Sequence, residues 1–177
     1  MSAGDLMIIQ TIIQGVGILS LIVLVYQIWN ANKWNRLNNS INQNWNERLE
    51  RFLCSANENL LRLKINKEKP LIPEEVNLIR NDSDAETSIR RFLFHLEEYA
   101  CAYIHGVIDP EYAYDMHSSS ILFYYKIYIE FIKAEREVKD DIYLFSGLAS
   151  LYDEWADRLE NEKKHVAKKY AKNRNLV

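Results

Sequence analysis

The sequence predicts an all-α protein, in which one N-terminal transmembrane helix is followed by a small cytoplasmic helical bundle. Three observations lead to this prediction. The 24 residues from Leu6 to Trp29 contain no charged side chain. Beyond them, apolar residues recur every three or four positions, which is the period of amphipathic helices. No segment shows the alternation of apolar and polar residues that is typical of half-buried strands.

The length and composition limit the chain to one compact domain with an appendage. It has 177 residues, of which 27% are charged, and a net charge of −3. This balance does not favour attraction of the whole protein to nucleic acid. Two cysteines, Cys54 and Cys101, are too few for a disulfide framework, and we expect both to be reduced core residues.

The uncharged N-terminal segment is long enough to cross a lipid bilayer. At about 1.5 Å per residue it covers roughly 36 Å, compared with a hydrocarbon core of roughly 30 Å. Only Asp5 is charged before it, whereas a cleaved signal peptide would begin with basic residues. Lys33 and Arg36 follow it, so the positive-inside rule places the remaining chain in the cytoplasm.

Polar and small residues form a heptad pattern along this segment, which we call the seam. Its glutamine amides would be unpaired against lipid but can hydrogen-bond to a second copy, and glycine permits close helix approach. The seam therefore predicts a homo-oligomer, and four copies, as in a tetramer, would be enough to surround a narrow polar path. The alternative is that the glutamines simply reach the membrane interface. The seam consists of Gln10, Gln14, Gly17, Leu21, Leu24 and Ile28.

We divide the chain into an anchor (1–30), a helical juxtamembrane stalk (31–66), a helical cytoplasmic domain (67–162) and a basic tail (163–177). Eight asparagines between residues 30 and 46 weaken helix propensity, so we expect a bend or frayed turn in the first part of the stalk.

Four further segments have helical patterns. Pro73, followed by two glutamates, is expected to start a short helical turn, and a longer helix follows Ser83 and stops at Gly106. Asp109 caps the next helix, with Pro110 in its first position, and this helix should run to about Arg136. Its expected apolar face contains Ala113, Met116, Phe123, Tyr124, Ile127 and Phe131. The last helix carries Ile142, Phe145, Leu148, Leu151, Tyr152, Trp155 and Leu159.

The sequence lacks the motifs of common enzymes, including a glycine-rich phosphate loop, a metalloprotease histidine pair and a nucleophile elbow. We therefore expect no catalytic site and no cofactor. His95, His105 and His117 lie ten to twelve residues apart without helical carboxylate partners, so no metal site is expected. Glu97 and Glu98 are expected to be solvated rather than an acid/base pair.

Two regions are candidate ligand-binding surfaces. The tyrosines between Tyr99 and Tyr128 are expected to pack in the core and at its rim, and the alternative is that Tyr112, Tyr114, Tyr125 and Tyr128 stack bases near Lys126 and Lys133. The tail could follow phosphates or anionic lipid, or it could be a solvated helix end whose cations suit the helix dipole. The tail cations are Lys163, Lys164, Lys168, Lys169, Lys172 and Arg174.

The run from Phe94 to Ala100, followed by Gly106 to Asp115, resembles a bacterial family of uncharacterised function. Its members look like one membrane helix followed by a small helical domain, with a glycine that stops one helix, an aspartate that caps the next, and a later tryptophan that Trp155 matches. This layout also resembles the membrane effector of the Hailong antiphage system.

The resemblance implies a function at the bacterial inner membrane. It implies a homo-oligomeric channel-like or membrane-disrupting effector whose cytoplasmic domain senses a nucleotide or oligonucleotide made by a partner nucleotidyltransferase. The alternative is a non-conducting, membrane-tethered helical module that binds a partner protein.

Overall fold

The computed structural model confirms the all-helical prediction. It describes the backbone of residues 3–42 and 45–174, and the side chains of residues 10, 14–39 and 47–167. No strand occurs in these ranges. The helices are α1 (Ala3–Asn42), α2 (Trp45–Arg62), α3 (Pro73–Arg80), α4 (Ser83–Ile104), α5 (Pro110–Lys139) and α6 (Ser146–Arg174).

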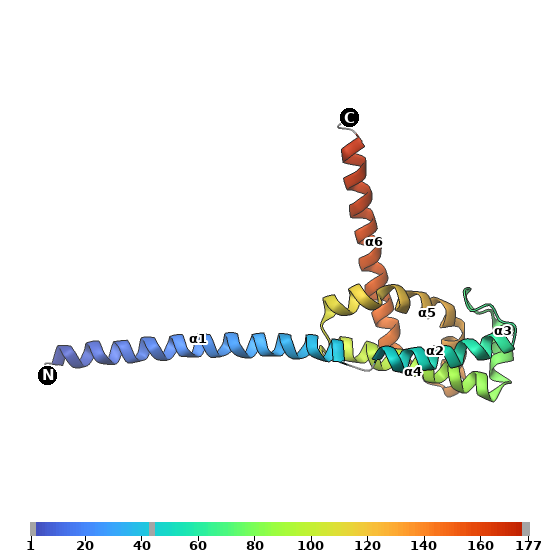
Figure 1. The fold of residues 1–177 in the computed structure, drawn as a ribbon, viewed down its shortest axis with the longest axis horizontal. Helices are drawn as coiled ribbons and strands as arrows, with labels where there is room; N and C mark the ends of the chain where they lie inside the picture. Colours follow the sequence, from blue (N-terminus) through green and yellow to red (C-terminus); the bar gives the residue numbers. More distant parts are fainter. Residues whose placement is uncertain (1–2, 43–44, 175–177) are drawn as a thin grey trace.

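α1 is a long rod that extends away from the other helices (Figure 1). Its stretch from Gln14 to Asn39 is long and apolar enough to cross a membrane, and none of that stretch is buried. Most side chains of the predicted span before Gln14 lie outside the described residues. α1 is described to Asn42 and α2 from Trp45, so the bend or frayed turn that the sequence predicts among the asparagines falls partly on residues 43–44, outside the described part of the chain.

α2 packs along α4 and belongs to the bundle. Ala56 and Leu60 of α2 are fully buried in the core, although the sequence analysis grouped them with the stalk. At the end of α2, Arg62 forms an ion pair with Asp82, the N-cap of α4, with an N–O distance of 2.7 Å. The second half of the 31–66 segment is therefore fixed to the domain by packing and by charge.

The two predicted helix boundaries between α4 and α5 are confirmed. Gly106 has a φ of +67°, the left-handed conformation that glycine adopts without steric strain. Asp109 caps α5 by accepting a hydrogen bond of 3.0 Å from the backbone N–H of Tyr112, and Pro110 is the first residue of the helix. The short turn predicted after Pro73 is the eight-residue helix α3.

Parts of the predicted apolar faces are wrong. Met116 and Phe123 are 57% and 44% exposed, because α5 carries apolar residues on more than one side and only one side packs against the bundle. α5 also continues past Arg136 to Lys139. Ile142 is 71% exposed and lies in the turn before α6, which begins at Ser146.

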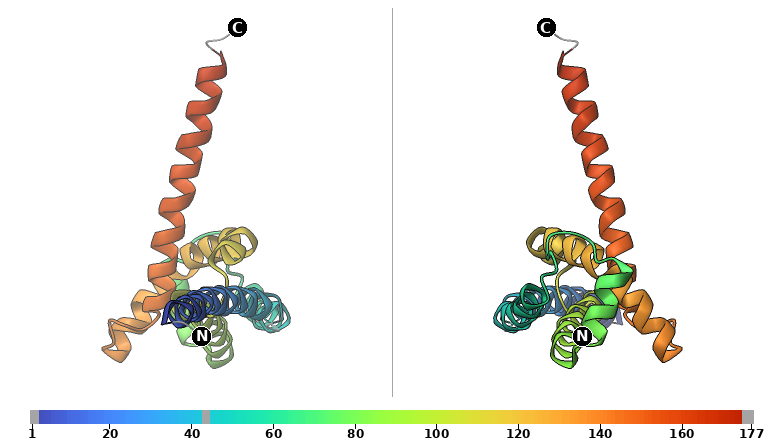
Figure 2. Two further views of the ribbon diagram at one scale, coloured as in Figure 1. Left: turned by 90° about the vertical axis from the view of Figure 1, so that its left-hand side faces the viewer. Right: turned by 90° about the vertical axis from the view of Figure 1, so that its right-hand side faces the viewer.

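α6 packs against the bundle with its first half only. Leu148, Leu151 and Trp155 are fully buried, and contacts with α4 and α5 hold this half. The second half projects beyond the bundle and runs across the direction of α1, in the view of Figure 1 and in the views along α1 in Figure 2. The free end of α6 is thus a separate arm.

Candidate membrane anchor and ligand-binding surfaces

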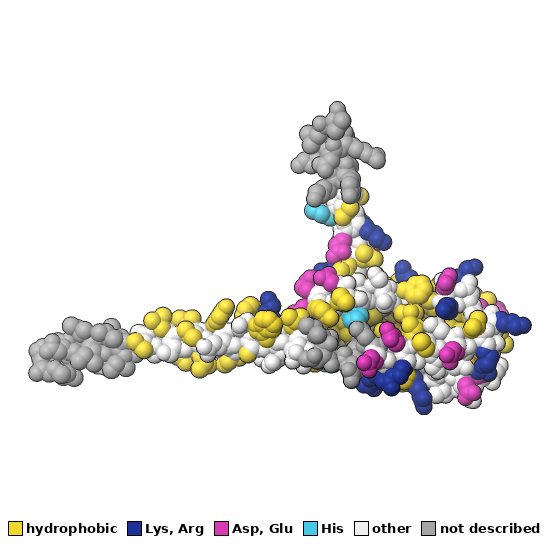
Figure 3. Space-filling model, in the orientation of Figure 1, with side chains coloured by type: hydrophobic (Ala, Val, Ile, Leu, Met, Phe, Trp, Pro, Cys, Tyr) yellow, Lys and Arg dark blue, Asp and Glu magenta, His cyan; other side chains and the backbone are white. Residues whose placement is uncertain are grey.

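The surface of α1 has the composition of a lipid-facing helix. Hydrophobic side chains cover much of its visible face in Figure 3, and those of Val16, Ile18 and Leu19 are 57% to 64% exposed. The first charged residue after Asp5 is Lys33, whose Nζ lies 5.9 Å from the centre of the Trp29 ring. An aromatic ring beside a cation at this point matches the composition of a membrane–water interface.

The seam lies on the exposed surface of α1 in the part of the chain that the structure describes. Gln10, Gln14 and Gly17 are exposed, and Leu21, Leu24 and Ile28 are 64%, 52% and 53% exposed. A Cβ atom added to Gly17 would meet no atom within 4 Å. This face is therefore open for contact with lipid or with a second α1.

The expectation that the tyrosines pack in the core is confirmed for Tyr125 and Tyr128, and the alternative of a base-stacking surface is wrong for these two residues. Tyr128 is 1% exposed, and its ring centre lies 5.7 Å from that of Phe92. Tyr125 is 8% exposed and stacks on Tyr152 at 4.4 Å. Burial raises the pKa of both phenols. Both rings are in the core, so they have no free face for a base.

The remaining candidate cations lie on two helices, α5 and α6. Lys126 is exposed on α5, and Lys133 Nζ lies 2.7 Å from the carboxylate of Glu130. In the tail, Lys163 is exposed and Lys164 forms an ion pair with Glu160 at 2.6 Å. The side chains of Lys168 and Lys169 lie outside the described residues.

Sequence reasoning did not find the charged network between α5 and α6. Arg158 donates hydrogen bonds to both carboxylate oxygens of Glu111, at 3.2 and 2.8 Å, and to Glu162 at 3.1 Å. Its guanidinium also lies 3.8 Å from the centre of the Tyr114 ring. The guanidinium lowers the pKa of Glu111. Only the (i, i+4) spacing of Arg158 and Glu162 was visible in the sequence.

A buried ion pair joins α4 to α5. Glu135 is fully buried, and its two carboxylate oxygens accept hydrogen bonds of 2.6 and 2.9 Å from Arg90. Glu86 also accepts from Arg90 at 2.9 Å, and hydrogen bonding to Glu135 raises the pKa of the guanidinium. The partners are 45 residues apart, so no local spacing predicts the pair.

The expectation that Glu97 is solvated is wrong, although Glu98 is exposed. The Glu97 carboxylate accepts hydrogen bonds from the backbone N–H groups of Gly147 and Leu148, at 2.9 and 2.6 Å. It therefore caps the positive end of the α6 dipole. A Cβ at Gly147 would lie only 2.9 Å from a Glu97 oxygen, so the glycine permits this close approach.

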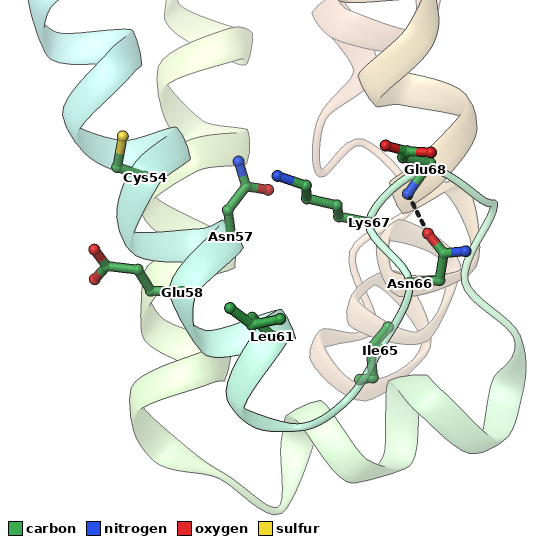
Figure 4. A pocket seen from close by; sticks show the side chains of 8 residues that line it. All are labelled: Cys54, Asn57, Glu58, Leu61, Ile65, Asn66, Lys67 and Glu68. Atoms are coloured by element: carbon green, nitrogen blue, oxygen red, sulfur yellow. Dashed lines mark hydrogen bonds between the residues drawn. The ribbon is translucent and has the colours of Figure 1, made fainter.

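The cysteine expectation is also partly wrong. Cys54 is exposed and Cys101 is half-buried. Cys54 lines an open groove of about 560 Å³ between α2 and the following loop, where Glu58, Lys67 and Glu68 lie around Leu61 (Figure 4). The groove presents charges of both signs, and no cluster of charged side chains in it marks a ligand.

No group of three or more potential metal ligands occurs among the residues that the structure describes. His117 packs edge-on against Tyr99, with ring centres 5.2 Å apart. Burial lowers the pKa of His117 below its ordinary value of 6.5.

The lowered pKa predicts a pH dependence. Between pH 6.5 and the lowered pKa, the unfolded chain binds a proton at His117 that the folded chain does not, so stability falls as the pH falls. We expect the Tm of the full chain in detergent to drop more between pH 7.5 and 5.5 than that of His117→Gln. Equal drops in the two proteins would contradict this prediction.

A family model described as a domain of unknown function (DUF4760) matches residues 15–155. The match begins within α1, covers the bundle and ends at Trp155, before the projecting end of α6. Searches of curated proteins and of solved structures find no match.

Proposed function

The chain belongs to the DUF4760 family, whose domain includes most of α1 together with the bundle, and from this premise we propose that anchor and bundle act as one unit in a homo-oligomeric membrane effector. In this proposal the seams of several α1 helices meet in the membrane, and the assembly conducts ions or disrupts the bilayer. The bundle lies on the cytoplasmic side and controls this activity.

The exposed seam of α1 is the observation that carries the proposal. Gln10 and Gln14 are polar side chains on a helix that is otherwise apolar for most of its span, and both are exposed among the residues that the structure describes. In lipid, an amide can satisfy its hydrogen bonds by pairing with the same amide on a neighbouring helix. Four or more helices arranged in this way would line a polar path with glutamines.

The resemblance to the Hailong effector supports a role in antiphage defence at the bacterial inner membrane, with a nucleotide or oligonucleotide as the trigger. Because Tyr125 and Tyr128 are buried, we propose that the bundle contacts the phosphates of this ligand and does not stack its bases. Exposed Lys126, with Lys133 about two turns further along the same face of α5, is the candidate contact.

The seam predicts a specific effect of two substitutions. We expect Gln10→Leu combined with Gln14→Leu to abolish depolarisation of cells that express the protein, as measured with a membrane-potential dye. Each interhelical glutamine hydrogen bond contributes about 1 kcal/mol, which is roughly a fivefold change in the association constant. The oligomer of the double variant should therefore also dissociate at a higher protein concentration than the wild type. Native mass measurement in detergent reports this second effect.

Gln27→Leu is the matched control, because Gln27 lies in the same exposed helix but outside the seam. We expect it to retain both depolarisation and oligomer mass. A chain that is monomeric or dimeric, and that depolarises cells under no condition, would exclude the effector. The non-conducting, membrane-tethered interaction module would then be the remaining function.

A further inference from the structure

The end of α6, residues 160–174, projects from the bundle, and we call it the arm. The positive charge of the cytoplasmic part is concentrated in this segment. From Lys163 to the C-terminus there are six Lys and Arg residues and no acid, whereas residues 92–162 contain fifteen acidic and only five basic residues. An anionic surface would therefore be repelled by α5 and the first half of α6 and attracted by the arm.

The arm is placed beside the base of the anchor. α1 contacts α5, and the first turns of α5 are bonded to α6 where the arm begins, through Glu111 to Arg158 and through Tyr114 to Glu162. From this point the arm runs across the direction of α1, and its tip leans toward the side on which α1 lies (Figure 1). If α1 crosses a membrane along its axis, the arm runs parallel to the membrane surface.

Beyond Glu162, every described side chain of the arm is exposed. Val166 is 50% exposed, and Lys163, Lys164 and Ala167 are also exposed. A helical segment of about fifteen residues is only marginally stable in water without contacts. Apolar residues combined with lysines are typical of helices that lie in a membrane interface, where both kinds of side chain find a partner.

We propose that the arm binds the anionic lipid headgroups of the leaflet at which α1 leaves the membrane. The lysines contact headgroup phosphates, which attract a cation within about 8 Å at physiological salt, and Val166 enters the interface. This contact fixes the orientation of the bundle relative to the membrane. The inference shares with the proposed function the membrane insertion of α1, but it does not depend on an oligomer.

The test uses the full chain in vesicles of phosphatidylcholine, with or without phosphatidylglycerol. In a Cys54→Ser, Cys101→Ala background, Val166→Cys carries an environment-sensitive fluorophore. We expect its emission to shift to the blue only when phosphatidylglycerol is present. The same label at Leu61→Cys, a residue that is 77% exposed on α2, is the matched control and should not respond.

Charge reversal provides the second variant. Lys163→Glu with Lys164→Glu is expected to remove most of the blue shift, while circular dichroism shows the same helix content. Emission at residue 166 that is the same in both lipid compositions would overturn the inference. So would a shift that appears only on addition of a 20-nucleotide single-stranded DNA, since this would assign the arm to nucleic acid.

A label at Leu21→Cys distinguishes failure of the inference from failure of its premise. If lipid-borne quenchers quench this label while residue 166 does not respond, α1 is in the membrane and only the arm inference is wrong. If Leu21→Cys is not quenched, α1 does not enter the bilayer, and both the inference and the proposed function are wrong.

Discussion

Replacing Arg90 by methionine is expected to lower the free energy of unfolding of the bundle by about 3 to 5 kcal/mol. Arg90 binds both oxygens of the fully buried Glu135 carboxylate. Methionine keeps an apolar stem but removes the cation, so the nearest remaining ion-pair partner is Lys139, at 3.9 Å. Thermal unfolding of the full chain in detergent, followed by circular dichroism, should show a Tm lower by about 10 to 20 °C.

Two further variants test whether the loss of stability comes from the buried ion pair or from the removal of any charged side chain. Arg90→Met combined with Glu135→Leu removes both charges, and we expect it to recover most of the lost stability, because no unpaired carboxylate stays buried. Lys133→Met breaks the exposed pair with Glu130 and should change the free energy of unfolding by less than about 1 kcal/mol. If Arg90→Met alone were as stable as the wild type, the pair would have no structural role.

Trp155→Ala is expected to lower the free energy of unfolding by a similar amount, about 3 to 5 kcal/mol, and to loosen mainly α6. Trp155 is fully buried, and the rings of Tyr103 and Tyr114 meet it edge-on, with centres 5.3 and 5.7 Å away. Removing the indole leaves a cavity where α6 packs against α4 and α5. Amide hydrogen exchange should therefore increase first in residues 146–159.

Tyr143→Ala is the control for the loss of an aromatic ring, because Tyr143 is 74% exposed. Its free energy of unfolding should stay within about 0.5 kcal/mol of the wild type. Uniform acceleration of exchange across all helices in Trp155→Ala would show that α6 does not loosen separately, and would contradict the localised effect.

Loosening of α6 also has a consequence for the proposed membrane contact. The arm is continuous with the helix that Trp155 holds in place, so the direction of the arm depends on this packing. The pair between Arg158 and Glu111 holds the same helix to α5 at the surface. Core packing and surface charge thus both orient the basic end of α6.

Local signals predicted much of the fold. Gly106 ends α4 and Asp109 caps α5, because each of these roles depends on one residue and its immediate neighbours in the chain. The apolar N-terminal helix also follows from composition alone. The sequence did not show where the bundle begins, because the burial of Leu60 depends on α4, which follows more than twenty residues later.

The candidate ligand site was predicted less well. Periodicity placed Tyr125 and Tyr128 on a helix near lysines, but it could not show which side of α5 faces the core. The tyrosine has an apolar ring and a polar hydroxyl, so its sequence context is compatible with either environment. Glu97 was misjudged for a similar reason, because its partners are backbone N–H groups about fifty residues away.

The sequence by itself determined the helical class, the apolar N-terminal helix with its seam, the capped turn between α4 and α5, and the basic end of the chain. Each depends on residues within one or two helical turns of one another. Only the tertiary structure decided that Tyr125 and Tyr128 are buried, that Arg90 pairs with Glu135, and that the arm runs crosswise to the direction of α1. Those features depend on which helix faces meet, and helix packing brings together residues that the chain separates by dozens of positions.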